Sequence, residues 1–287
     1  MLSVLIVNWN TRDHLLRCLE SLRKYPPPGD WEAVVVDNAS TDGSAEAVER
    51  EHPWARMIRS RGNLGYAAGN NLAIREAKGD LLLTLNPDTE MLEGTLTKAV
   101  EIMEARPDVG VLAGRLMNPD GTTQPSVRGF PTPGTILAEI LGLGKVLPTS
   151  HSMGAYRRAF FDYDREGEAE QPMGTFLLFR KSALDAVGLL DEGFPIFFNE
   201  VDLLHRLRRS GWMILYSPDV RLIHYGGAST RQVRKKMIWE SHRSLIRYLR
   251  KWFGQWWRWP LLVPLFGLIW LGALVRARGW DAGFRRT

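Results

Sequence analysis

Apolar runs of strand length alternate with amphipathic segments up to about residue 117. In the amphipathic segments the apolar positions recur every three or four residues, which is typical of helices that bury one face. The predicted strands are 3–9, 32–38, 55–60, 80–86 and 109–116, and the predicted helices are about 12–24, 42–51, 67–78 and 93–105. Each strand-helix unit takes about 25–30 residues, so the pattern predicts an α/β fold with a mixed, mainly parallel sheet flanked by helices.

The pattern is less regular after residue 117. Turn-forming residues fill 118–135, and the polar, charge-dense segment 142–172 is predicted to be a mobile surface loop, with a structured binding element as the alternative. Regular structure returns at 174–184. Further elements are predicted as a helix at 199–211, strands at 213–218 and 220–225, and a basic helix at 231–253.

The positive charge of the chain is concentrated in its last part. Residues 231–287 hold 13 Lys and Arg against two acids, whereas residues 1–230 hold 24 against 30, which together give the net charge of +5. Residues 231–287 also contain seven of the 11 tryptophans. Basic residues beside tryptophan are typical of segments at an anionic membrane surface, and nucleic acid is the weaker alternative partner. The sequence therefore predicts a main domain at 1–230 and a basic, Trp-rich helical extension at 231–287 that binds a membrane.

Residues 260–275 form an uncharged stretch of 16 residues within this extension. A helix of that length spans about 24 Å, which is shorter than the roughly 30 Å hydrocarbon core of a bilayer. Pro264 and Gly267 weaken the helix further, so a monotopic, in-plane or re-entrant anchor is expected, with a core helix or an oligomer contact as the alternative. Cys18 is the only cysteine, which excludes an intrachain disulfide and fits a cytosolic setting. The opening "MLSVLIVNWNT" has no basic start or cleavage site, so no signal peptide is expected.

Polar residues follow two of the predicted strands at the point where each strand ends. Asp37 ends the second strand, and Asn86 and Asp88 follow the leucine-rich run at 81–85. The carboxyl ends of parallel strands share the sheet edge at which open α/β folds bind ligands. Asp37 could accept hydrogen bonds from a nucleobase or ribose, or instead make a local turn. Asp88 could bind Mg²⁺ or Mn²⁺ together with substrate phosphates, and Asn86 could bond ribose or phosphate.

The segment "RGNLGYAAGNN" at 61–71 has glycines ahead of a predicted helix, which suggests in a general way a loop that cradles phosphate. It lacks the GxGxxG spacing of the dinucleotide-binding fingerprint and the Gly-Lys-Ser/Thr ending of a Walker loop.

Two acids and a histidine complete the candidate chemistry. Glu200 and Asp202 open a predicted helix and point about 200° apart, so one is expected to act as a base while the other orients a substrate hydroxyl or caps the helix. The alternative is that both acids only favour the helix dipole. An ordinary glutamate is ionised at neutral pH, so a base at Glu200 needs no large shift of its pKa. His224 ends a strand before two glycines that let a ligand approach, and it is either structural or a second metal ligand.

Taken in order, the stretches "VNWNT", "VDNASTDGS", "GNLGYAAGNN", "NPD", "NEVDLLHRL" and "IHYGG" resemble the family 2 glycosyltransferases of the GT-A fold. The chain is most similar to bacterial rhamnosyltransferases of cell-wall and O-antigen assembly, over roughly residues 1–250. The resemblance implies inverting transfer of a sugar from a nucleotide-diphosphate donor, with dTDP-rhamnose favoured. The implied acceptor is a polyprenyl-diphosphate-linked saccharide at the cytoplasmic face of the cell membrane, where the enzyme would be peripheral or monotopic.

The resemblance also implies roles for individual residues. Asp88 and His224 would bind the metal, Glu200 would be the general base, and Asp202 would lie close to the acceptor. The implied donor nucleotide-binding residues are Asn8, Asn10, Thr11, Asp37, Asn63, Gly65, Asn70 and Asn86. The usual Asp-x-Asp of the family reads Asn86-Pro87-Asp88, which implies a lower metal affinity. The usual pair of acids before "VDL" reads Asn199-Glu200, which leaves Glu200 as the base.

Two other functions remain open at this stage. A nucleotidyltransferase that makes sugar nucleotides would need a glycine-rich loop near the first strand, but "VNWNTRDHLL" has no glycine and Arg12 is its one candidate cation. A catalytically inactive, membrane-bound scaffold that binds sugar nucleotides is the second alternative. The identity of the sugar, the acceptor and its linkage, and whether the chain forms a homo-oligomer are not determined by the sequence. The irregular region 130–172 is expected to shape the acceptor site.

Overall fold

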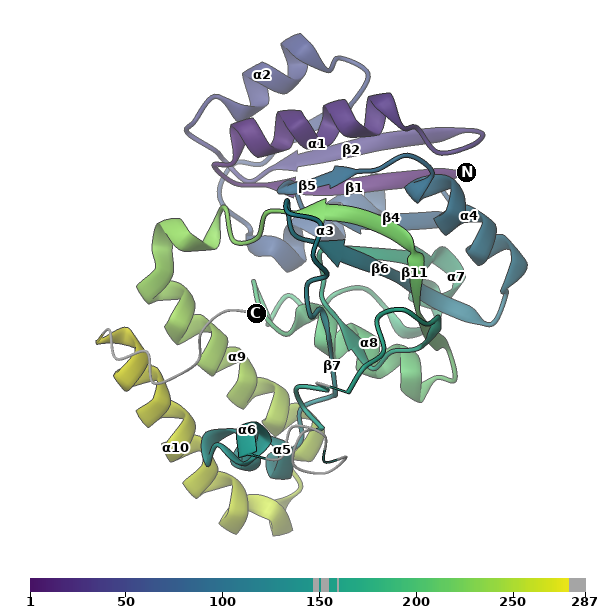
Figure 1. The fold of residues 1–287 in the computed structure, drawn as a ribbon. Coiled ribbons are helices and arrows are strands. Elements are labelled where there is room, and N and C mark those ends of the chain that lie inside the picture. The colour runs from purple at the N-terminus through teal and green to yellow at the C-terminus, as the bar shows by residue number, and fades with distance from the viewer. Residues whose placement is uncertain (147–149, 151–154, 159, 279–287) are drawn as a thin grey trace.

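The structure is a computed structural model that describes residues 1–146, 150, 155–158 and 160–278. Within these residues a nine-stranded sheet forms the centre of the protein in the order β3-β2-β1-β4-β10-β6-β11-β5, and β8 pairs with β11 (Figure 1). The strands are β1 (Leu2–Asn8), β2 (Trp31–Asp37), β3 (Arg56–Arg59), β4 (Leu81–Leu85), β5 (Thr89–Met91), β6 (Val109–Met117), β8 (Gly167–Glu168), β10 (Phe176–Arg180) and β11 (Met213–His224). The predicted α/β fold is confirmed. The sheet is mixed, because β10, β5 and β8 run antiparallel to their neighbours.

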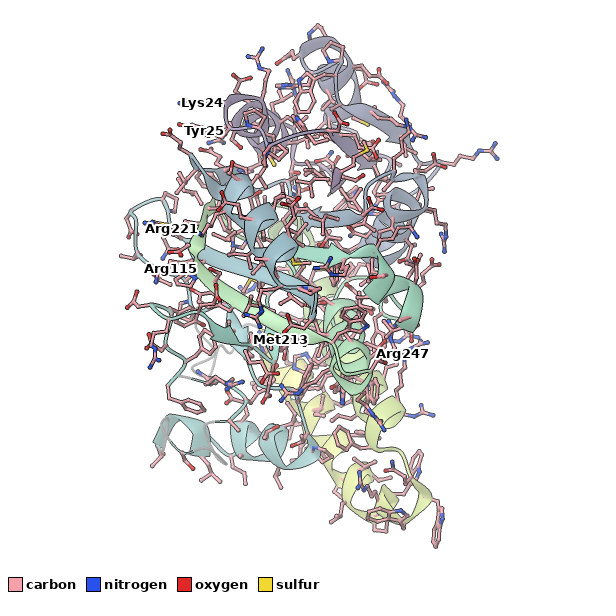
Figure 2. The ribbon with its side chains drawn as sticks, turned by 90° about the vertical axis from the view of Figure 1, so that its right-hand side faces the viewer. Lys24, Tyr25, Arg115, Met213, Arg221 and Arg247 are labelled. Atoms are coloured by element: carbon pink, nitrogen blue, oxygen red, sulfur yellow. The ribbon has the colours of Figure 1, made fainter. Side chains whose placement is uncertain are left out.

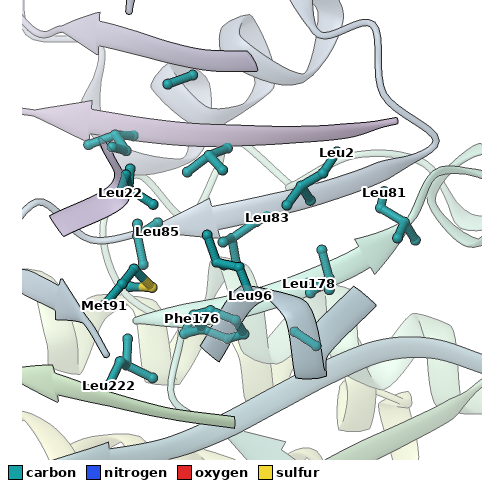
Figure 3. Packing of buried hydrophobic residues seen from close by; sticks show 14 of the residues in the cluster. Leu2, Leu22, Leu81, Leu83, Leu85, Met91, Leu96, Phe176, Leu178 and Leu222 are labelled. Carbon is teal, nitrogen blue, oxygen red and sulfur yellow. The ribbon is translucent and has the colours of Figure 1, made fainter. Parts of the chain in front are cut away.

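Helices cover both faces of this sheet. They are α1 (Arg12–Lys24), α2 (Ser44–Glu51), α3 (Gly65–Glu76), α4 (Thr95–Ala105), α7 (Lys181–Val187) and α8 (Asn199–Arg209). The side chains of β1 alternate between the faces: Val4 and Ile6 join the hydrophobic cluster under α1 and α4, whereas Leu5 and Val7 join the cluster under α3, α7 and α8. Figure 3 shows part of the first cluster, where Leu85 of β4 and Phe176 of β10 contribute side chains. Burial on both faces explains why these strands read as continuous apolar runs.

The strand register brings distant residues to one edge of the sheet. β1 pairs in parallel with β2 and β4, with Asn8 opposite Asp37 and Ile6 opposite Leu85, so the three strands end together. β11 runs parallel to β6, and Arg221 lies beside Arg115 in this pair (Figure 2). The end of β11 then pairs with β5, which places His224 opposite Thr89, the residue that follows Asp88.

Two sequence predictions differ from the structure. The structure has one strand, β11, where the sequence predicted two strands at 213–218 and 220–225. The register of its pairing with β6 shifts between Ser217 and Arg221. The irregular region contains α5 (Pro133–Ile140), α6 (Leu143–Val146) and a small sheet of β7 (Val127–Arg128) and β9 (Gln171–Pro172). A capping box between Thr132 and Thr135 starts α5, with Pro133 in its first turn. The expected loop at 142–172 is therefore partly wrong, and its residues 147–149, 151–154 and 159 lie outside the described residues.

The C-terminal extension shares a core with the main domain. It consists of the short helix η1 (Thr230–Val233), α9 (Arg234–Phe253), η2 (Trp256–Arg258) and α10 (Trp259–Ala277). Tyr248 of α9, Ile269 of α10, Ile136 of α5 and Val201 of α8 belong to one buried cluster. The expected boundary at residue 230 therefore does not separate two independent hydrophobic cores.

This shared core can be tested with two leucines. Leu249 of α9 is completely buried, whereas Leu261 of α10 is 76% exposed. Leu249→Ala should lower the free energy of unfolding by about 2–5 kcal/mol, because it leaves a cavity between α9 and the rest of the cluster. Leu261→Ala should change it by less than about 0.5 kcal/mol. Urea unfolding followed by circular dichroism measures both, and equal effects of the two changes would contradict the shared core.

Candidate active site

The centre of the candidate site is a buried pair formed by Asp88 and His224. Asp88 Oδ1 lies 3.6 Å from His224 Nε2, and both side chains are almost completely buried. Burial lowers the pKa of His224 below its usual value, although the charge of Asp88 opposes this effect. The imidazole is therefore neutral at neutral pH, and its nitrogen can act as a ligand.

Gln124 fixes the orientation of this imidazole. Its side-chain nitrogen donates to Asn118 Oδ1 at 2.8 Å and to the His224 carbonyl at 2.7 Å, so its oxygen faces His224 Nδ1 at 2.9 Å. An amide oxygen can only accept, so Nδ1 carries the proton and the lone pair of Nε2 is on the side of Asp88. Metal-binding histidines are usually held in this way by a hydrogen bond on the other ring nitrogen. Asp88 and His224 can therefore share one cation.

The turn after β11 connects this pair with the end of β1. Gly226 and Gly227 have φ values of +73° and +75°, a left-handed conformation that favours glycine. The turn brings Ala228 N to 3.3 Å from Asp88 Oδ2, and Ser229 Oγ then donates to the Trp9 carbonyl at 3.0 Å. The two glycines were expected to let a ligand approach, but in the structure the backbone turn itself requires them.

A second polar group lies where β1 and β2 end. Asn8 Nδ2 donates to Asp37 Oδ1 at 2.9 Å, and Ser40 N donates to Asp37 Oδ2 at 2.9 Å. Thr11 Oγ1 donates to Asn8 Oδ1 at 2.6 Å. Asn8, Thr11 and Asp37 are buried, so Asn8 and Thr11 act on Asp37 by fixing its orientation. Asp37 makes a local turn with Ser40 but does not cap α2, which begins later at Ser44.

Asn10 joins two loops beside this group. Its φ is +51°, and its side-chain oxygen accepts a hydrogen bond from Thr41 N at 2.8 Å. Its carbonyl accepts from Gln232 Nε2 at 2.7 Å. The segment that follows His224 thus contacts both polar groups of the candidate site.

The N-terminus of α3 is occupied by protein, which corrects the expectation of a phosphate-cradling loop. The Pro195 carbonyl accepts from Tyr66 N at 2.6 Å and from Ala67 N at 3.1 Å, and Asn63 Oδ1 accepts from Gly65 N at 2.9 Å. These amides already have acceptors and do not face a ligand. A Cβ at Gly65 would meet the Pro195 oxygen at 2.8 Å, so the close packing of this loop requires glycine.

Three asparagines remain near these groups. The amide nitrogen of Asn70 donates to the Tyr66 carbonyl within α3, and that of Asn38 donates to the Gly65 carbonyl. Within the part of the chain that the structure describes, the side-chain oxygens of Asn70 and Asn38 are buried without a hydrogen-bond partner. Asn86 is partly buried, and its backbone N–H donates to the Thr175 carbonyl at 2.9 Å.

Glu200 opens α8 and is partly buried. Burial raises the pKa of its carboxyl to about 7, although backbone N–H groups at the start of the helix oppose the increase. The preceding Phe198 has a φ of +68°, which is unusual for a bulky residue and sets the direction in which the helix begins. The sequence predicted an ordinary glutamate, but the structure places one whose pKa suits general base catalysis near neutral pH.

Gly174 and Tyr66 connect Glu200 with the Asp88 pair. A Cβ at Gly174 would lie 3.3 Å from Glu200 Cγ, so the backbone just before β10 runs beside this carboxylate. The Tyr66 hydroxyl donates to the Gly174 carbonyl at 2.9 Å. Burial raises the pKa of Tyr66, and the charges of Glu200 and Asp88 both add to the increase. The charges of both carboxylates therefore act on the same phenol.

Asp202 faces away from this region, which corrects its expected place near the acceptor. Its carboxylate is completely buried and contacts Arg206 Nε at 2.9 Å, Lys251 Nζ at 2.8 Å and Trp252 Nε1 at 3.0 Å. Lys251 and Trp252 belong to α9. Asp202 therefore links α8 to the C-terminal extension.

Four further residues of the candidate site were not predicted from the sequence: Gln124, Tyr66, Gly174 and Asn38. Tyr66 and Asn38 lie inside the quoted motifs and could have been found by their position. Gly174 is the first residue of the regular structure predicted at 174–184. Gln124 lies in the turn-rich segment 118–135, where no sequence pattern marks it as a functional residue.

Comparison with known proteins identifies the family. The family model for "Glycosyl transferase family 2" matches residues 3–164. The chain belongs to this family. This glycosyltransferase is 30% identical to N-acetylglucosaminyl-diphospho-decaprenol L-rhamnosyltransferase of Mycobacterium tuberculosis, over 93% of this chain and 90% of the relative. It is also 26% identical to rhamnosyltransferase WbbL of Escherichia coli, over 88% of this chain and 93% of the relative.

Solved glycosyltransferases share its fold. Mannosyltransferase PcManGT of Pyrobaculum calidifontis, in complex with GDP-Man and Mn²⁺, superposes with a TM-score of 0.61 at 19% identity, over 99% of this chain and 76% of the other. TarS of S. aureus, residues 1–349, gives a TM-score of 0.56 at 16% identity, over 97% of this chain and 82% of the other. The predicted membership of family 2, the GT-A-type fold and the assignment as a glycosyltransferase are confirmed.

Glu200 and Asp202 should respond oppositely to amide substitution. The pKa of Glu200 in the folded protein, about 7, lies above its ordinary value of 4.5, so the folded state binds more protons between these pH values and loses stability as the pH rises through them. Glu200→Gln should therefore unfold at the same temperature as the wild type near pH 5 and at a higher temperature at pH 8.

Asp202→Asn should instead lower the free energy of unfolding at both pH values by about 1–3 kcal/mol, because a neutral amide replaces the buried carboxylate that accepts charge-assisted hydrogen bonds from Arg206 and Lys251. Thermal unfolding by calorimetry at pH 5 and pH 8 measures both variants. A loss of stability for Glu200→Gln at pH 8, or none for Asp202→Asn, would contradict these assignments.

Proposed function

We propose that this glycosyltransferase transfers rhamnose from dTDP-rhamnose to a hydroxyl group of a saccharide carried on a polyprenyl diphosphate, with inversion at the anomeric carbon. The mycobacterial relative, named for such a sugar and such a lipid-linked acceptor, supports this substrate class. The observation that carries the proposal is the convergence of Asp88, His224 and Glu200 around Tyr66 and Gly174 at one sheet edge, next to the polar group of Asp37.

Asp88 and His224 are proposed to hold Mg²⁺ or Mn²⁺. Their buried oxygen and nitrogen face each other, and Gln124 keeps the imidazole in the form that binds metal. Within the described residues no group of three or more His, Cys, Asp or Glu could hold a metal ion. Two protein ligands suffice where substrate phosphates complete the coordination, as is usual for Mg²⁺. When bound, the ion would neutralise the negative charge that grows on the departing nucleoside diphosphate.

Glu200 is proposed as the general base. As the acceptor oxygen forms its bond to the anomeric carbon, Glu200 takes the hydroxyl proton, and the bond to the diphosphate oxygen breaks on the opposite face. This single displacement inverts the configuration and needs no covalent enzyme intermediate. A carboxyl whose pKa is about 7 is ionised in a large fraction of molecules at cytoplasmic pH and is still basic enough to accept a proton.

Asn8, Thr11, Asn10 and Asp37 are proposed to form the nucleoside end of the donor site. Asn70 and Asn86 are proposed to line the donor pocket, while Asn63 and Gly65 shape it by holding the start of α3. The basic extension is proposed to keep the enzyme at the cytoplasmic face of the membrane as a peripheral or monotopic protein, where a lipid-linked acceptor is available.

Glu200→Gln should lower kcat at least 100-fold and leave the Kd for dTDP within threefold of the wild type, because a neutral amide cannot accept the acceptor proton. The wild-type kcat/KM should increase with pH up to about pH 7 and then level off, since the base must be ionised. Glu104→Gln, a change on the exposed side of α4, is the matched control. Turnover by Glu200→Gln comparable to that of Glu104→Gln would exclude Glu200 as the base.

Asp88→Ala and excess chelator should each stop transfer. In calorimetric titrations with dTDP present, Gln124→Leu should weaken Mn²⁺ binding about 10- to 100-fold, because His224 loses the acceptor that holds its ring. Gln255→Leu, which changes an exposed glutamine before η2, should bind Mn²⁺ like the wild type.

Replacing dTDP by UDP in these titrations tests which nucleotide the donor carries, and dTDP should bind more tightly than UDP. Full activity in chelator would exclude the metal, and a preference for UDP would exclude the thymidine donor.

A further inference from the structure

α10 presents an apolar face to the outside of the protein. One stripe of the helix, formed by Leu262, Leu265, Ile269 and Ala273, is buried against the rest of the chain. The remaining surface is also apolar, and together with η2 it exposes large side chains: Trp256 (84%), Trp257, Trp259, Leu261, Val263, Leu268, Trp270, Leu271 and Leu274. Exposed apolar surface of this extent on a soluble domain usually marks a protein or membrane contact.

A second apolar element lies beside α10, although it is more than 100 residues earlier in the chain. We call Pro133–Val146 the α5–α6 segment. Its Ile136 shares the buried cluster with Leu265 and Ile269 of α10, and both helices lie at the end of the molecule opposite to α2 (Figure 1). The segment exposes Leu137, Ile140, Leu141 (62%) and Val146 (74%). Its one acid, Glu139, is paired with Arg157 at 2.9 Å and is almost buried, so its charge is compensated.

Cations lie at the border of this apolar surface. The Arg258 guanidinium lies 4.4 Å from the centre of the Trp257 ring, and the Arg250 guanidinium lies 5.9 Å from that of Trp259. Further exposed cations follow along α9: Arg234, Lys235, Lys236 and Arg243. Indoles with cations beside them are typical of the headgroup layer, where the ring is amphipathic and the cation meets lipid phosphate.

The packing of α10 on α9 favours a helix lying in the plane of a membrane. Trp256–Ala277 is the one helical stretch among the described residues that is long and apolar enough to cross a bilayer. α10 contacts α9 along its length, and Trp239 of α9 packs against Trp270 of α10 with ring centres 5.6 Å apart. If α10 crossed the bilayer in this arrangement, the charged side chains of α9 would enter the hydrocarbon, which is costly. In the plane, α10 buries its outward face and α9 keeps its charges at the headgroups.

We propose that the α5–α6 segment and α10 form one composite surface that docks onto an anionic lipid bilayer, with the α5–α6 segment as a second membrane contact separate from the C-terminal extension. Two contacts from different parts of the chain fix the tilt of the protein on the bilayer, which a single in-plane helix does not. The inference deepens the membrane association in the proposed function. Vesicle binding is measured without turnover, so failure of this inference and failure of glycosyl transfer are distinguishable.

The test is co-sedimentation of the full chain with vesicles of phosphatidylcholine and phosphatidylglycerol in a 3:1 ratio. Leu137→Ser combined with Leu141→Ser should weaken binding at least tenfold, because two leucines no longer enter the apolar layer. Leu261→Ser combined with Leu271→Ser in α10 should weaken it at least as much. Trp54→Ser is the control and should bind like the wild type. Trp54 is an exposed aromatic residue three positions after the end of α2, and α2 lies at the opposite end of the molecule from α10 (Figure 1).

Each outcome decides one part of the inference. Wild-type binding by the Leu137/Leu141 variant, with an unchanged unfolding temperature, would overturn the second contact. Equal binding of the wild type to vesicles of pure phosphatidylcholine would overturn the requirement for anionic lipid. If the same variant converts a dimer to a monomer in analytical ultracentrifugation and still binds vesicles, the surface joins two copies of the chain and the membrane inference is wrong.

Discussion

The buried carboxylate of Asp202 is the interaction on which the arrangement of the site depends. An ionised acid without exposed surface must be compensated, and here Arg206 from the same helix and Lys251 and Trp252 from α9 all reach it. These contacts leave α8 little freedom to rotate. Glu200, about 200° around the same helix, is therefore directed toward Gly174 and Tyr66 instead of toward α9. Asp202 is compensated by these partners, whereas burial raises the pKa of Glu200 to about 7.

The same helix links the proposed chemistry to the proposed membrane contact. Val201, next to Glu200, shares a buried cluster with Tyr248 of α9 and with residues of α5 and α10. Phe198, whose left-handed conformation starts α8, packs its ring 5.7 Å from that of Tyr248. The proposed base is thus held by the elements that carry the exposed apolar surface. A bilayer that orders α5 and α10 would also steady the start of α8, so lipid binding and catalysis would share structural elements.

The local sequence pattern predicted most of the fold, but the arrangement of the candidate site depends on contacts between residues that are far apart in the sequence. Strand periodicity and the polar residues at strand ends were enough to predict that Asp37, Asn86 and Asp88 lie at one edge of the sheet, whereas Asn8 was implied by the family resemblance. Periodicity does not encode pairing between distant strands. It therefore could not predict that β10 pairs antiparallel with β4 or that β11 pairs with β5. Asp202 was misplaced for the same reason. Its partners on α9 lie about 50 residues away, and two acids at the start of a helix do not reveal which side will be covered.

The charges at the sheet edge explain how an anionic donor could be bound there. Asp37, Asp88 and Glu200 bring negative charge, and the first amides of α3 already bond to Pro195 and Asn63, so the helix terminus does not attract a diphosphate. Positive charge has to come from elsewhere. Arg128 of β7 is close enough for its charge to lower the pKa of Glu200, although burial has the larger, opposite effect. The proposed cation between Asp88 and His224 would supply the rest, so that nucleotide and metal bind together and each depends on the other.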